Sequence, residues 1–259
     1  KTILSVATQG QKMKTSDWKG ATWITIDKDD DRNQFRTSVL IPSNSVVLRA
    51  TCFVAGLGYQ RSWLNGKRLG NASNTLGHVS QFQRRVPYET YDISGILQPG
   101  KNVLSVLLGR GWYALPEDNF THVLGYRTIG PRALKVLCTA ELKDGRKIHI
   151  RSGKDEWRFA AGELSFDHLF LGPTIDKRKA TNGWRSKYYD DSKWDLVTSA
   201  EENIPTGRLT SFIMPPVQRH EPRLPVKITK INIQGSQHFV LDFEVNQAMQ
   251  CTLRFASDG

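Results

Sequence analysis

Long apolar segments are missing from this chain of 259 residues. No run of about 18 apolar residues occurs, so the sequence predicts no membrane-spanning helix. No signal-peptide pattern begins at Lys1, as is expected of a mature secreted chain or of a trimmed one. Apolar residues still make up 39% of the chain, with seven tryptophans. This proportion predicts a globular protein with a sizeable core.

Cysteine is scarce, and the chain lacks the spacing of cysteines and histidines that holds a metal. Cys52, Cys138 and Cys251 each lie in an apolar segment of strand length. We therefore expect buried free thiols, in preference to one disulfide with a thiol left over. The sequence also lacks a recognisable catalytic serine or cysteine constellation, and we assign no catalytic residue.

Acidic residues are fewer than basic ones: the chain has 25 Asp and Glu residues and 36 Lys and Arg residues, so its net charge is +11. Such a surplus fits either attraction to an acidic polymer, such as a uronic-acid polysaccharide, or a dispersed basic surface. The basic residues are spread along the chain, which favours the dispersed surface. A nucleic-acid module would interleave aromatic residues with a basic stripe or carry a known motif. The sequence has neither, so we expect no nucleic-acid partner.

Helical periodicity is missing too, and short apolar runs separated by turn residues take its place. Cys52–Ala55 and Val103–Leu108 are two such runs. Asn65-Gly66 predicts a tight hairpin, because both residues tolerate positive φ. Pro99-Gly100 predicts a second turn just before the Val103–Leu108 run. The pattern is typical of an antiparallel β-sandwich.

Alternating apolar residues predict two further strand pairs. Phe35–Ile41 and Val46–Ala55 flank a Pro-Ser-Asn turn, and we expect them to pair with each other. Ala133–Glu141 and Lys147–Arg151 flank Asp144-Gly145 and predict a hairpin. The sequence therefore predicts an all-β fold.

Four segments taken together resemble the N-terminal, non-catalytic β-sandwich module of bacterial-type α-L-rhamnosidases. They are Ala55–Gly70 (AGLGY…LNGKRLG), Tyr88–Ser94 (YETYDIS), Leu97–Tyr113 (L-x-PGKNVLxVLLGxGWY) and Asp144–Arg146 (DGR). The resemblance continues more loosely to the end of the chain. It is broken at Leu76–Phe82, at Pro173 and at Glu244-Val245, where the family usually has other residues.

The resemblance implies a fold and a division into domains. Residues 1–199 are expected to form a galactose-binding-like jelly-roll β-sandwich. Residues 200–225, which contain five prolines, are expected to be a linker. Residues 226–259 alternate again and are expected to supply the first strands of a second, incomplete β-sandwich.

The resemblance also implies a function. The α-L-rhamnosidases are inverting glycoside hydrolases, whose paired carboxylates belong to a helical barrel downstream of these sandwiches. We expect this chain to be the accessory, carbohydrate-binding portion of such an enzyme, inactive alone, with the catalytic barrel as its partner. The enzyme would remove terminal rhamnose from glycans or polysaccharides. The alternative is a non-catalytic carbohydrate-binding or extracellular structural protein that reuses the scaffold.

The loop that follows the Val103–Leu108 run holds the candidate site. Modules that resemble this one can bind rhamnose with calcium, so we expect Trp112 and Tyr113 to form a platform for the sugar. Asp118 and Asn119 would bind its hydroxyl groups, and Glu117 and Asp118 would bind calcium. The alternative is that the two aromatic residues are core or interdomain packing and that the acidic residues belong to a solvated turn.

Two glycosylation sequons begin at Asn71 and Asn119. Both fall in expected loops, and they favour a secreted or extracellular protein. A glycan on Asn119 would prevent its amide from binding a sugar. The sequence therefore leaves two uses open for Asn119.

Overall fold

The computed structural model describes residues 18–26, 32–70, 79–116, 129–200, 204–212 and 222–246. The chain divides into two compact units, Lys1–Val217 and Gln218–Gly259. Within the described residues the regular structure is strands and short 3₁₀ turns such as η2 (Lys177–Lys179), without an α-helix. None of their helical segments has the length and apolar character needed to cross a membrane. The all-β expectation is confirmed.

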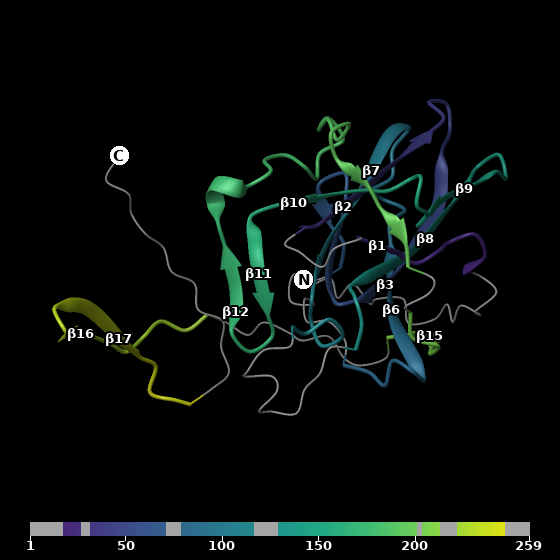
Figure 1. Cartoon of the computed structure of the whole chain (residues 1–259). Helices are drawn as coiled ribbons and strands as arrows, with labels where there is room; N and C mark the ends of the chain where they lie inside the picture. The colour runs from purple at the N-terminus through teal and green to yellow at the C-terminus, as the bar shows by residue number, and fades with distance from the viewer. Residues whose placement is uncertain are drawn as a thin grey trace. The chain divides into compact units, whose positions relative to one another are not determined.

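Two sheets make up the body of the first unit (Figure 1). The first sheet has the order β14-β1-β8-β3-β6-β15, with β9 also paired to β8. Its strands are β1 (Ile24–Thr25), β3 (Val47–Leu57), β6 (Arg85–Asp92), β8 (Ala133–Leu142), β9 (Lys147–Arg151), β14 (Thr198–Ser199) and β15 (Arg208–Ser211).

The second sheet has the order β13-β10-β2-β7-β4-β5. Its strands are β2 (Arg32–Ile41), β4 (Tyr59–Leu64), β5 (Lys67–Arg68), β7 (Gly100–Gly109), β10 (Arg158–Ala161) and β13 (Asp195–Leu196). The hairpin of β11 (Leu164–His168) and β12 (Gly172–Ile175) forms a small sheet of its own.

Strand β3 is buried on both of its faces. Cys52 and Val54 face the core between the two sheets, where they join Leu104 of β7. Phe53 and the residues that alternate with it face a second cluster, on the other side of the first sheet. A strand covered on both sides needs apolar residues at successive positions rather than at every second one. This explains the unbroken apolar run at Cys52–Ala55.

The predicted turns at Asn65-Gly66 and Gly100 are confirmed. Asn65 and Gly66 have φ of 52° and 80°, and Gly100 has φ of 86°. The side-chain amide of Asn65 donates to Asn102 Oδ1 over 2.8 Å, and its Oδ1 accepts from the Val103 backbone N–H over 2.9 Å. The Asn102 amide in turn donates to the Gly100 carbonyl over 3.0 Å. The side chains of the two turns therefore hold each other in place.

One predicted strand pairing is wrong, because β2 and β3 do not pair. β2 pairs with β7 and β10 in the second sheet, and β3 pairs with β6 and β8 in the first. The turn after Ile41 therefore carries the chain from one sheet to the other. Alternation of apolar residues shows which face of a strand is buried, and it leaves the partner strand open. The predicted hairpin of β8 and β9 is confirmed.

The expectation of free thiols is wrong for two of the cysteines. Cys52 and Cys138 are register partners on β3 and β8, and they form a disulfide. Because 86 positions separate them in the sequence, only the strand pairing brings them together. Closing a loop of this length contributes about 4–5 kcal/mol in the chain-entropy account of disulfides. Cys251 lies outside the described residues.

The expected linker at 200–225 contains a strand. β15 pairs in parallel with β6 and so extends the first sheet. In the second unit, β16 (Lys227–Ile233) and β17 (Ser236–Asp242) form an antiparallel hairpin. The strand expected at Cys251–Phe255 lies outside the described residues. The domain limits of 1–199, 200–225 and 226–259 stay a prediction.

A buried arginine fixes the segment that crosses the outer face of the second sheet. The Arg36 side chain is fully buried, and its Nε donates to Asp191 Oδ2 over 2.6 Å. Its Nη atoms donate to the backbone carbonyls of Trp184, Ser186 and Tyr189 over 2.6–3.0 Å. Three backbone carbonyls and one carboxylate between residues 184 and 191 thus converge on one guanidinium. This segment carries the Trp184 ring onto the sheet.

We expect the substitution Arg36→Met to lower the free energy of unfolding by about 3 kcal/mol or more, because it leaves a carboxylate and three carbonyl groups without their donor. The measurement is urea denaturation followed by tryptophan fluorescence.

Arg49→Met is the matched control. Arg49 is also bound to a carboxylate over 2.6 Å, that of Glu141, but its side chain is 77% exposed. An exposed pair contributes under about 1 kcal/mol. Equal losses in the two variants would contradict the anchoring role of Arg36.

Alkylation tests the disulfide. Iodoacetamide applied to the denatured chain without reductant should label one of the three cysteines, and labelling after reduction should reach all three. Peptide mass spectrometry should recover a linked pair that contains Cys52 and Cys138. Labelling of all three cysteines before reduction would show that the pair is not formed in the isolated chain.

Candidate functional site

The end of β7 lies against the start of β4 and the β11–β12 hairpin. Asp167 Oδ2 accepts a hydrogen bond of 2.6 Å from the Arg110 backbone N–H. A Cβ atom at position 109 would overlap the Asp167 carboxylate, and one at position 111 would overlap the Tyr59 ring. Gly111 also has φ of 55°, in the left-handed region. Glycines at 109 and 111 therefore allow these three chain segments to meet.

Trp112 and Tyr113 point into different surroundings. Trp112 is partly exposed, and its ring lies perpendicular to that of Phe170 with 5.8 Å between centroids. Tyr113 is 2% exposed and packs on Phe82 with 4.9 Å between ring centroids. The Tyr113 ring therefore belongs to the core and presents no face to a sugar. Of the expected two-residue platform, only Trp112 lies at the surface.

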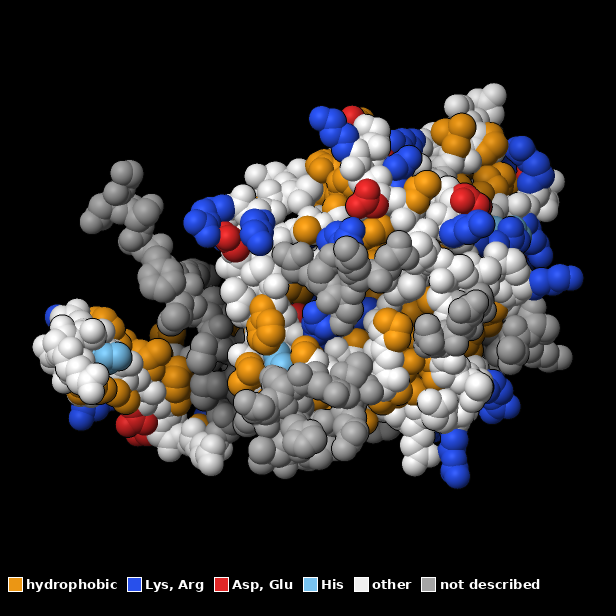
Figure 2. Space-filling view, viewed as in Figure 1, with side chains coloured by type: hydrophobic (Ala, Val, Ile, Leu, Met, Phe, Trp, Pro, Cys, Tyr) orange, Lys and Arg blue, Asp and Glu red, His pale blue; other side chains and the backbone are white. Residues whose placement is uncertain are grey.

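The β11–β12 hairpin supplies apolar surface beside Trp112. His168, which is buried, accepts at Nδ1 from the backbone N–H groups of Phe170 and Leu171 over 3.2 and 3.0 Å, and so shapes the turn. Phe166 and Phe170 are 41% and 39% exposed. Figure 2 shows hydrophobic side chains gathered over this hairpin. In the sequence these residues lie more than 50 positions after Trp112, and only the fold brings Phe170 into contact with it.

A hydrogen bond and a charge act on the hydroxyl of Tyr59. Burial raises the pKa of Tyr59 to about 12, the negative charge of Asp167 adds to the rise, and a side-chain hydrogen bond with Trp112 opposes it. The indole can only donate, so the Tyr59 oxygen accepts that bond. The phenol stays protonated at neutral pH. Tyr59 thereby holds the indole of Trp112 in one orientation, which a rigid sugar platform requires.

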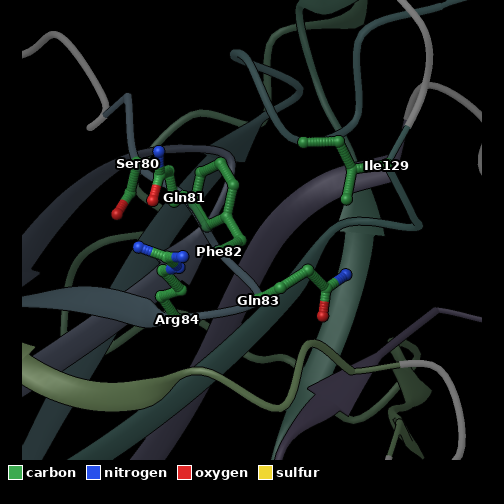
Figure 3. Close-up of a pocket in the computed structure, with 6 residues that line it drawn as sticks. All are labelled: Ser80, Gln81, Phe82, Gln83, Arg84 and Ile129. Carbon is green, nitrogen blue, oxygen red and sulfur yellow. The ribbon is translucent and has the colours of Figure 1, made fainter.

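A shallow pocket lies beside Phe82, which packs on Tyr113. The pocket is an open depression with a volume of about 440 Å³. Figure 3 shows polar side chains around the ring of Phe82, with Ile129 across from them. Phe82 packs on the Tyr113 ring, and the Ile129 N–H donates to the Tyr113 carbonyl over 3.0 Å. The pocket is lined by Ser80, Gln81, Phe82, Gln83, Arg84 and Ile129.

The polar half of the predicted site lies outside the described residues. This applies to Glu117, Asp118 and Asn119, and to the sequon at Asn71. The described chain runs to Pro116 and resumes at Ile129, so Trp112 and the pocket at Phe82 lie near the two ends of that stretch. Within the described ranges there is no group of three or more His, Cys, Asp or Glu side chains that could hold a metal. The calcium ligands stay a prediction.

Comparison with known proteins decides the family. The model of the α-L-rhamnosidase N-terminal domain matches residues 45–221 of the chain. The chain belongs to this family. A curated α-L-rhamnosidase of Streptomyces avermitilis is 34% identical over 228 residues, which cover 88% of this chain and 21% of that protein. The chain therefore spans about a fifth of the length of this relative.

Solved structures of rhamnosidases contain the same fold. The S. avermitilis α-L-rhamnosidase complexed with L-rhamnose aligns with a TM-score of 0.67 and 31% identity, over 78% of this chain and 19% of that one. An α-L-rhamnosidase from Dictyoglumus thermophilum aligns with a TM-score of 0.71 and 28% identity, over 84% of this chain and 25% of that one. The β-sandwich of this rhamnosidase N-terminal domain is thus confirmed.

The raised pKa of Tyr59 predicts a pH effect on stability. An unfolded tyrosine has a pKa of about 10, so between pH about 10 and about 12 the folded chain keeps a proton that the unfolded chain releases. This contribution to stability is complete below pH 10 and is lost as the pH rises through the folded pKa. Tyr59→Phe should therefore lose less unfolding free energy over that range than the parent chain. Urea denaturation at pH 9 and pH 11 measures the difference.

Tyr188→Phe is the control for this experiment, because Tyr188 is 85% exposed. It should follow the parent chain at both pH values. Parallel behaviour of the Tyr59 and Tyr188 variants would contradict the perturbation of Tyr59.

Proposed function

We propose that this domain binds a rhamnose-containing glycan as the N-terminal accessory portion of an α-L-rhamnosidase. The observation that carries the proposal is Trp112, an indole that is partly exposed, fixed by Tyr59 and flanked at right angles by Phe170. Aromatic rings held in this way stack on the apolar face of a pyranose. Membership of the rhamnosidase N-terminal domain family, and a relative complexed with L-rhamnose, support rhamnose as the sugar.

The acidic loop that follows would complete the site. Glu117 and Asp118 would supply carboxylate oxygens for calcium, and Asp118 and Asn119 would hydrogen-bond the hydroxyl groups of the sugar. Carboxylate oxygens are ligands that calcium prefers, which supports Glu117 and Asp118 as its ligands in the proposal. With Tyr113 in the core, Trp112 is the aromatic partner in this arrangement.

Hydrolysis would be the task of another part of the protein. Inversion at the anomeric carbon needs an acid and a base about 6.5–9.5 Å apart on either side of the bond. We propose that these groups belong to a catalytic barrel outside residues 1–259, and that this chain alone is inactive. Binding by the domain would hold the polymer near that barrel and raise its effective concentration there.

An extracellular location fits this role. The substrate would be the rhamnose ends of glycans or polysaccharides, which lie outside the cell. The disulfide between Cys52 and Cys138 supports an oxidising compartment. Glycans on Asn71 and Asn119 belong to the same proposal, and occupancy of Asn119 would remove it from the sugar site.

A second candidate is a non-catalytic carbohydrate-binding or structural protein on the same scaffold. Pro173 and the neighbouring exposed residues of the β11–β12 hairpin favour it, since the sequence departs there from the family pattern. Helical repeats with paired acids in the remainder of the gene would decide for the enzyme.

Titration of L-rhamnose into the chain by calorimetry, with calcium and with EDTA, tests the site. We expect binding that weakens when calcium is removed, and an affinity about tenfold or more lower in Trp112→Ala, because the stacking face is lost. Tyr188→Ala is the matched control, as it removes an exposed aromatic ring elsewhere. Unchanged affinity in Trp112→Ala would overturn the platform. Unchanged affinity in EDTA would overturn the calcium ligands alone.

A further inference from the structure

Three arginines surround Trp63 on the outer face of the second sheet. Arg68 is the register partner of Trp63 across the β4–β5 hairpin, and Arg61 lies two residues before Trp63 on the same strand. Register partners and alternate residues share one face of a sheet. Arg185 lies above that face, with its guanidinium carbon 4.0 Å from the centroid of the Trp63 ring. Residues from β4, β5 and the 184–191 segment therefore bring three guanidinium groups together.

Arg185 is held in place but is not satisfied. Its guanidinium also lies 5.1 Å from the Trp184 ring, and Arg36 anchors the backbone on both sides of it through the carbonyls of Trp184 and Ser186. Its Nε is buried and lacks a hydrogen-bond partner among the described residues. Burial lowers the pKa of Arg185, the charges of Arg61 and Arg68 lower it further, and only Glu163 opposes them.

The nearby acids have partners of their own. Glu163 Oε2 forms an ion pair of 2.6 Å with Lys177 Nζ. The charges of Glu89 and Arg68 both act on Tyr91, and Glu89 accepts a hydrogen bond from the Tyr91 hydroxyl. Arg36 shows the contrasting case of a buried arginine in which each of the three guanidinium nitrogens has an acceptor. The cluster around Trp63 thus brings three positive charges together, and the Arg185 Nε is its donor without an acceptor among the described residues.

We propose that Arg61, Arg68 and Arg185 form a binding site for the carboxylate or sulfate groups of an acidic polysaccharide. Guanidinium groups bind such oxyanions through two parallel hydrogen bonds. Contact of the Arg185 guanidinium with the Trp63 and Trp184 rings fixes its plane before a ligand binds. Arg61 is exposed and Arg68 and Arg185 are half-buried, so part of each of the three side chains is open to a polymer that crosses this face. The net charge of +11 strengthens the attraction to a polyanion.

This site goes beyond the proposed rhamnose site and uses different residues. Trp112 contacts Phe170 and Tyr59, whereas the arginines surround Trp63. A polysaccharide that alternates rhamnose with acidic sugars would suit both sites. Either site can fail while the other stands.

Binding of three probes to the 259-residue chain tests the proposal: trigalacturonate for carboxylate, a sulfated dextran for sulfate, and maltotriose as the neutral sugar. We expect binding of one or both anionic probes that weakens with added salt, and no binding of maltotriose.

Arg185→Gln should weaken the binding about tenfold. Arg61→Gln, at an exposed position, should weaken it about threefold. Arg185→Lys should fall between the parent and Arg185→Gln, because it keeps the charge and loses the fork.

Arg146→Gln is the matched control. It removes one positive charge from the β8–β9 turn, where Arg146 is paired with Asp144, and it should change the affinity by less than about twofold. Equal effects of the Arg146, Arg61 and Arg185 variants would overturn the site and leave a diffuse electrostatic attraction. Binding of single-stranded DNA as tight as that of the sugars, with the same dependence on Arg185, would overturn the assignment to a polysaccharide. L-Rhamnose affinity should stay unchanged in Arg185→Gln, which separates this test from that of Trp112.

Discussion

The guanidinium of Arg36 is the contact on which the outer face of the second sheet depends. A charge with no exposed surface is tolerated only when its donors find acceptors, and the 184–191 segment supplies them. The need to satisfy one buried charge therefore fixes the path of a segment that has almost no regular structure. That path places Trp184 on the sheet and Arg185 over Trp63. A structural arginine thus positions another arginine, whose Nε lacks an acceptor among the described residues.

The two sheets use their faces differently. The first sheet is packed on both sides, with the inter-sheet core on one and the cluster of Trp18, Phe53 and Tyr88 on the other. The second sheet packs one face on the core and carries the 184–191 segment on the other. Both candidate binding surfaces involve strands of this second sheet, Trp112 after β7 and the arginines on β4 and β5. A sheet with only one face in the core can carry binding groups on the opposite face without loss of core packing.

Burial separated two residues that are adjacent in the sequence. Trp112 and Tyr113 have the same chemical character, and nothing in the pattern of residues distinguishes a platform from core packing. In the structure, Gly111 turns the chain so that one ring meets Tyr59 and Phe170 while the other enters the cluster with Phe82. The cysteines follow the same rule, because Cys52 and Cys138 become neighbours only when β3 and β8 pair.

Local information determined much of this protein from the sequence alone. The strands, the turns at Asn65-Gly66 and Gly100, the β8–β9 hairpin and the family all follow from residues close together in the chain, because φ preferences and alternating burial act over a few positions. The tertiary structure alone decided which strands pair, which cysteines meet, which aromatic ring stays at the surface and which arginine lies above Trp63. These contacts join residues far apart in the sequence. Their geometry comes from the packing of whole sheets and from the satisfaction of buried polar groups, which no short pattern of residues encodes.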